Sequence, residues 1–142
     1  MLVGVLYFTD MALRDQPYFP LYVQDFMTDE KLAECSASAT GVFIRLMCVF
    51  HKSEQYGTIT LRPKDKQTPD TTANFAFKLV KQMPYPAQEI NSALEELISE
   101  GVLMLDGDIL YQKRMVKDGE ISLKRSEAGR TGGKNKSSDD LP

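Results

Sequence analysis

The stretch PAQEINSALEELISEGVLMLDGDILYQ, residues 86–112, decides the fold of this chain. In its first half, Ile90, Leu94 and Leu97 recur at spacings of four and three residues, which is typical of an amphipathic helix with one buried face. Polar side chains occupy most of the positions between them. The pattern predicts a helix over residues 87–100.

The second half of the stretch predicts a β-hairpin. Gly101 is expected to end the helix, because glycine readily adopts the left-handed conformation of a helix C-terminus. Two apolar runs then flank Asp106-Gly107, and an Asp-Gly pair in that setting is the strongest local signal for a tight hairpin turn. We expect residues 102–105 to pair antiparallel with residues 108–112.

Three further elements are expected upstream. Residues 39–52 are apolar nearly all round, which predicts a central helix buried on most sides, with Ser38 as its N-cap. Residues 58–61 form a short β-branched strand. A polar surface loop over 62–72 then leads into a second helix over 73–83.

The order helix, short strand, helix, helix, hairpin is that of a winged helix-turn-helix domain. The expected fold class is α+β, mainly α, in which the short strand joins the hairpin in a small three-stranded antiparallel sheet. Residues 87–100 then take the place of a recognition helix. We place this domain at residues 17–115, between an N-terminal extension over 1–16 and a basic flexible tail or linker over 116–142.

The N-terminal region carries an apolar start and an aromatic segment. Residues 1–8 are too short for a membrane span, which needs about 20 apolar residues, and no basic residue precedes them as in a signal peptide. Met1–Asp10 is therefore a strand or an extension from a misassigned start codon, and we expect a cytoplasmic protein without membrane contact. The segment around Pro20 should begin extended, and Thr28 should cap a short helix. The side chains expected to cover the core are Tyr18, Phe19, Leu21, Tyr22 and Phe26.

Charge is unevenly spread along the 142 residues, whose net charge is −3. Residues 113–136 hold eight basic and three acidic side chains, so the rest of the chain is acidic. An acidic body followed by a basic tail is typical of a protein whose tail contacts a polyanion. A disordered, solubilising tail is the alternative interpretation.

Catalytic, metal and nucleotide sites are not expected. Cys35 and Cys48 lie in predicted helices, where a free thiol behaves as a small hydrophobe, and with His51 as the only histidine they cannot complete a zinc site. The run GRTGGK, residues 129–134, does not match the spacing of a phosphate-binding loop. We therefore expect a non-enzymatic protein without a cofactor or metal.

Candidate DNA contacts fall in three groups. Gln88 and Asn91 on the predicted recognition helix could bind an adenine edge through their amides, although the carboxylates around them repel phosphate. Lys78 and Lys81 on the preceding helix could contact phosphate. The basic tail supplies the remaining candidates, which are Lys113, Arg114, Lys117, Lys124, Arg125, Arg130, Lys134 and Lys136.

An ordered series of phrases resembles a family of phage and prophage replication initiation proteins, of the replisome organiser type. The series consists of Phe19-Pro-Leu-Tyr with Asp25-Phe26, then Thr40–Leu46, Leu94–Gly101, Gln112–Val116 and Ser126–Lys134. The resemblance implies the winged-helix N-terminal domain of such a protein, which binds origin DNA and recruits the replicative helicase or its loader. Members of the family usually continue into a C-terminal module.

Two functions of different classes follow. The first is a non-catalytic DNA-binding domain of a phage-type replication initiation protein, anchored on phosphates by the wing and the tail. The second is a protein–protein adaptor that uses the same fold to self-assemble as a homo-oligomer or to recruit a helicase or its loader. The basic tail favours the first and the acidic helix over 87–100 favours the second. A transcriptional regulator ranks third, because nothing resembles an effector domain.

Overall fold

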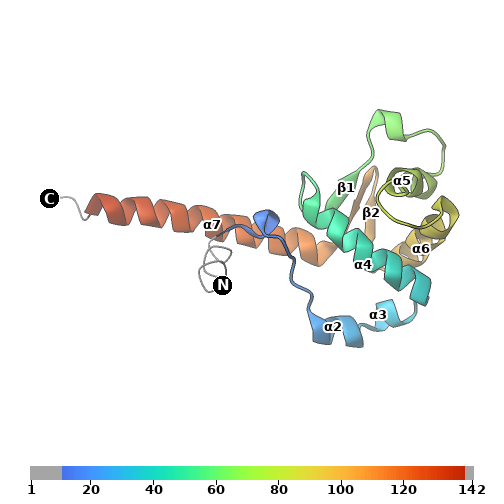
Figure 1. Ribbon diagram of the computed structural model, residues 1–142, viewed down its shortest axis with the longest axis horizontal. Coiled ribbons are helices and arrows are strands. Elements are labelled where there is room, and N and C mark those ends of the chain that lie inside the picture. Colours follow the sequence, from blue (N-terminus) through green and yellow to red (C-terminus); the bar gives the residue numbers. More distant parts are fainter. Residues whose placement is uncertain (1–10, 140–142) are drawn as a thin grey trace.

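The computed structural model describes the backbone of residues 11–139 and the side chains of residues 11–129 (Figure 1). It is a mainly helical α+β fold with one small three-stranded antiparallel sheet, as expected. The interpretation of Met1–Asp10 lies outside the described residues. In chain order the elements are η1 (Leu13–Asp15), α2 (Val23–Thr28), α3 (Glu30–Ala33), α4 (Ala37–Lys52), β1 (Thr58–Thr60), η2 (Pro63–Asp65), α5 (Thr71–Leu79), α6 (Ala87–Ser99), β2 (Met104–Asp106), β3 (Ile109–Tyr111) and α7 (Lys113–Asp139).

The sheet confirms the predicted hairpin and the predicted short strand. Its strand order is β1-β3-β2, with β3 paired antiparallel to both neighbours. Leu110 is the centre of this register, opposite Ile59 on one side and Leu105 on the other. Gly101 and Gly107 have φ values of +77° and +58°, so glycine supplies the left-handed conformation at both the helix end and the hairpin turn.

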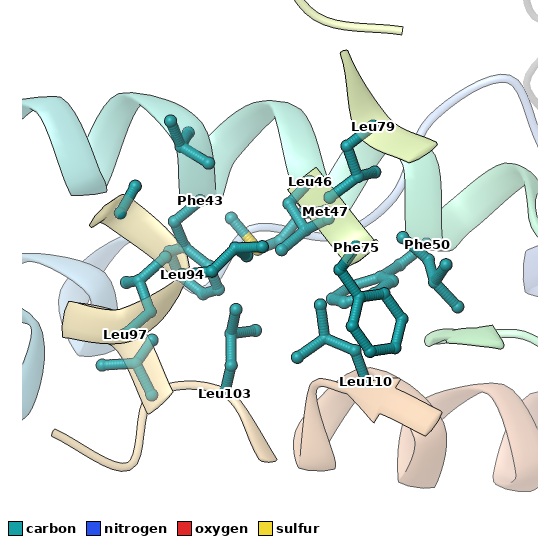
Figure 2. Packing of buried hydrophobic residues seen from close by; sticks show 14 of the residues in the cluster. Phe43, Leu46, Met47, Phe50, Phe75, Leu79, Leu94, Leu97, Leu103 and Leu110 are labelled. Carbon is teal, nitrogen blue, oxygen red and sulfur yellow. The ribbon is translucent and has the colours of Figure 1, made fainter. Parts of the chain in front are cut away.

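The helices α4, α5 and α6 pack around one hydrophobic core, to which Leu110 of β3 contributes from the sheet (Figure 2). Phe50 of α4 and Phe75 of α5 are fully buried. The predicted helix boundaries shift by a few residues because side chains outside the apolar pattern cap them. Ser36 rather than Ser38 caps α4, and Asp70 caps α5 by accepting from two backbone N–H groups.

Residues 11–16 contact the helical body. Ala12 and Leu13 are buried, and the Leu13 N–H donates to Ser122 Oγ on α7 over 2.7 Å. His51 Nε2 lies 2.7 Å from the carbonyl oxygen of Gln16, which can only accept a hydrogen bond. These contacts fasten the start of the described chain to both α4 and α7.

The aromatic segment covers the core only in part. Phe19 and Phe26 pack against the core, as expected, but Tyr18, Leu21 and Tyr22 are exposed. No residue of α2 is fully buried. The expected cap at Thr28 is wrong, because the side chain of Asp29 accepts the hydrogen bonds at the start of α3.

The long helix α7 spans the predicted boundary at residue 115. The helix begins at Lys113, directly after β3, and its buried Met115 belongs to the core. Figure 1 shows α7 leaving the body as a single straight helix. The segment expected to be a flexible tail from residue 116 is therefore helical through Asp139.

Cys48 does not have the buried position expected of it. Both Cys35 and Cys48 are free thiols, but Cys48 is exposed on the outer side of α4 and Cys35 is only partly buried. The α4 helix is thus less completely surrounded than its composition predicts.

Candidate nucleic-acid interface

Carboxylates of α6 bind the N-terminus of α4. Glu96 accepts hydrogen bonds from the Ser36 N–H over 2.9 Å and from the Ser36 hydroxyl over 2.8 Å. Glu89 accepts from the Ser38 hydroxyl over 2.8 Å. The Ser36 backbone N–H, followed by its hydroxyl, holds the pKa of Glu96 below its usual range. These acids therefore have a structural role at a helix N-terminus, where negative charge is favourable.

The two amide side chains expected to read bases do not lie in equivalent places. Gln88 is exposed on α6, whereas Asn91 is partly buried. The Asn91 Oδ1 atom is shielded from solvent and accepts no hydrogen bond from the described residues. Because α6 carries no lysine or arginine, an approach of its outer face to DNA would meet carboxylates without offsetting cations.

The hairpin tip is acidic as well. Residues 102–112 contain no lysine or arginine, and Asp106 and Asp108 flank the turn. Asp108 forms an ion pair with Lys66 from the loop that follows η2. The hairpin therefore offers no cation of its own to a phosphate.

Lys78 is less available for phosphate than its sequence position predicts. Its Nζ lies 2.8 Å from Asp65 Oδ2 and donates to the Thr60 carbonyl oxygen over 3.2 Å. The hydrogen bond from Lys78 lowers the pKa of the Asp65 carboxyl, with help from the Arg62 N–H. Lys81, in the turn that follows α5, is exposed.

Arg114 is likewise engaged, in this case with α2. Its Nη1 lies 2.5 Å from Asp25 Oδ2, and its guanidinium carbon stands 3.9 Å from the centre of the Tyr22 ring. The Tyr22 hydroxyl donates to Asp118 Oδ2 over 2.7 Å, and that carboxylate raises the pKa of Tyr22. Arg114 therefore links α2 to the N-terminal end of α7.

Lys113, Lys117 and Lys124 form the largest exposed set of candidate cations, which we call the α7 lysine face. Their spacings of four and seven residues place them within about 40° of one another around the helix, with the exposed Glu120 on the same side. The partly buried residues of α7 lie on its other side, against the body. Arg125 is exposed beside this face, and the side chains of Arg130, Lys134 and Lys136 lie outside the described residues.

Sequence reasoning missed a second group of cations in the loop between β1 and α5. Arg62 and Lys64 are exposed around η2, and the local sequence RPKDK was the available signal. The prediction treated residues 62–72 only as a polar surface loop. Because Lys78 binds Asp65, this loop is held next to α5.

Other kinds of site find no support among the described residues. Within residues 11–139, no helix is both long and apolar enough to cross a membrane. Among the side chains of residues 11–129, no three histidine, cysteine or acidic groups converge as metal ligands. Comparison of the sequence and the structure with family models, curated proteins and solved structures finds no match in any of the three.

Proposed function

We propose that the chain is a non-catalytic, winged-helix DNA-binding domain of the phage replication initiation type. The order α4, β1, α5, α6, β2, β3 and the sheet order β1-β3-β2 support the winged-helix interpretation. The resemblance of the sequence phrases supports the replication class, with origin DNA and a helicase or its loader as partners.

The α7 lysine face is the observation that carries this proposal. Three exposed lysines lie on one side of a helix that projects from an acidic body (Figure 1). Phosphate contacts of this kind release counterions and give affinity without sequence specificity. By contrast, α6 and the hairpin tip present carboxylates, so the proposal keeps the expected phosphate contacts of the segment after residue 112 and leaves out those of the wing.

A protein–protein adaptor is the second candidate, and exposed apolar side chains on α2 favour it. Val23 and Met27 stand one helical turn apart with exposed fractions of 66% and 74%. Large apolar side chains grouped in this way are typical of surfaces that meet another protein. A helicase loader or a second copy of the chain are the partners to test.

Binding to a short fluorescent duplex tests the first proposal. Lys117→Ala with Lys124→Ala should weaken binding of the full chain, whereas Lys31→Ala with Lys52→Ala removes the same charge from exposed sites elsewhere and should not. Point substitutions are preferable to deleting α7, because the deletion would also remove the buried Met115. If no form of the chain binds the duplex at about 50 mM salt, the DNA proposal is wrong and the adaptor is favoured.

A further inference from the structure

Phe77 on α5 is an aromatic side chain that the core does not use. Its exposed fraction is 52%, whereas its neighbours Phe75 and Ala76 are buried. Because burial of a phenylalanine ring is favourable, an exposed one in a well-packed helix is available for another contact.

Exposed cations lie in the turn after α5 and around η2. Lys81 follows Phe77 by four residues and is exposed in the turn directly after α5, where the Val80 N–H still donates to the Ala76 carbonyl oxygen as in a helix. Lys78, the residue after Phe77, binds Asp65 of η2, so the exposed Arg62 and Lys64 lie on a segment held next to α5. We call Arg62, Lys64, Phe77 and Lys81 the α5–η2 surface.

The charge of this surface is positive. The neighbouring acids Asp65 and Asp108 are bound by Lys78 and Lys66. Arg62, Lys64 and Lys81 make no ion pair with any described residue. An exposed aromatic ring beside uncompensated cations has the chemistry to hold a base by stacking and its phosphates by charge.

We propose that the α5–η2 surface binds single-stranded nucleic acid, with one base stacked on Phe77 and the adjoining phosphates on Arg62, Lys64 and Lys81. A duplex is a poorer ligand here, because its base faces are already stacked and only the cations could engage it. The surface is separate from the α7 lysine face, since Figure 1 shows α7 leaving the body on the side away from α5. The inference therefore does not depend on duplex binding by α7.

Fluorescence can report on this site alone because the chain contains no tryptophan. In the full chain, Phe77→Trp should place a single fluorophore that a short oligothymidylate quenches by stacking. Tyr18→Trp is the matched control, because Tyr18 is 51% exposed and lies outside the α5–η2 surface. Quenching confined to the Phe77→Trp variant supports the proposal, and absent or equal quenching in the two variants overturns it.

Affinity gives an independent test in the Lys117→Ala/Lys124→Ala background, where the contribution of α7 is reduced. Phe77→Leu keeps an apolar side chain but removes the ring, and it should weaken binding of oligothymidylate about tenfold. Phe77→Tyr keeps the ring and should bind within about twofold of the parent. Equal affinity of the Phe77→Leu variant and its parent would overturn the proposal, whatever the result for duplex binding by α7.

Discussion

The ring of Tyr56 lies directly against the backbone of Gly119. A Cβ atom on Gly119 would stand 2.5 Å from Tyr56 Cδ1 and 3.0 Å from its Cγ. Burial is the main reason that the pKa of Tyr56 is raised to about 12, and its hydroxyl lies 2.8 Å from His51 Nδ1. The contact thus joins the projecting helix α7 to the end of α4.

Gly119→Ala should therefore destabilise the protein. The added methyl group meets atoms close to the Tyr56 backbone, which cannot simply swing aside, and overpacking of this kind costs about 1–3 kcal/mol. The higher helix propensity of alanine compared with glycine offsets about 0.5–1 kcal/mol of this cost. We expect a net loss of about 1–2 kcal/mol in the free energy of unfolding, measured by urea denaturation.

Gly129→Ala is the matched control on the same helix. Nothing lies within 4 Å of a Cβ at this position, so only the gain in helix propensity remains. Equal effects of the two substitutions would mean that α7 is not packed against Tyr56.

Leu97→Ala should destabilise the body by about 2–5 kcal/mol, because Leu97 is fully buried and its truncation leaves a cavity. Chemical denaturation measures the change. Leu123→Ala on α7, where the side chain is 40% exposed, should cost far less. A loss below about 0.5 kcal/mol for Leu97→Ala would show that this face of α6 is not in the core.

Glu96 should make stability depend on pH. Its pKa is lowered in the folded protein by the Ser36 N–H and hydroxyl, so its carboxylate stabilises the fold above the ordinary glutamate pKa. That stabilisation is lost as the pH falls through the folded value. The difference in free energy of unfolding between the wild type and Glu96→Gln should be present at neutral pH and shrink below about pH 4.

Glu95→Gln on the same helix is the control, because Glu95 is exposed and makes no hydrogen bond to Ser36. Denaturation of both variants at a series of pH values separates them. A pH-independent difference for Glu96→Gln would contradict a role for the carboxylate at the α4 N-terminus.

Local sequence signals were sufficient to predict the hairpin and the core helices. Asp106-Gly107 predicted the turn and Ile90, Leu94 and Leu97 predicted the buried face, because both signals act over a few residues. The helical α2 was missed, since contacts with residues far along the chain, such as Asp25 with Arg114, hold it.

The candidate site was less predictable from the sequence than the core, again because it depends on contacts between residues far apart in the chain. Whether a lysine or arginine is exposed depends on its tertiary neighbours, and a count of charges could not show that Lys78 binds Asp65 or that Arg114 binds Asp25. The same count overlooked Arg62 and Lys64, which lie far in sequence from the basic tail. Only the structure shows which lysines and arginines form ion pairs and which are exposed and unpaired among the described residues.

The salt dependence of duplex binding tests the central claim most directly. Each lysine that contacts a phosphate contributes about −0.9 to the slope of log affinity against log salt concentration, so the α7 lysine face should give a slope of about −3. Lys117→Ala with Lys124→Ala should reduce the magnitude of that slope by about 1.8, whereas Lys31→Ala with Lys52→Ala should leave it unchanged. Equal slopes for the wild type and the Lys117→Ala/Lys124→Ala variant would contradict phosphate binding by α7.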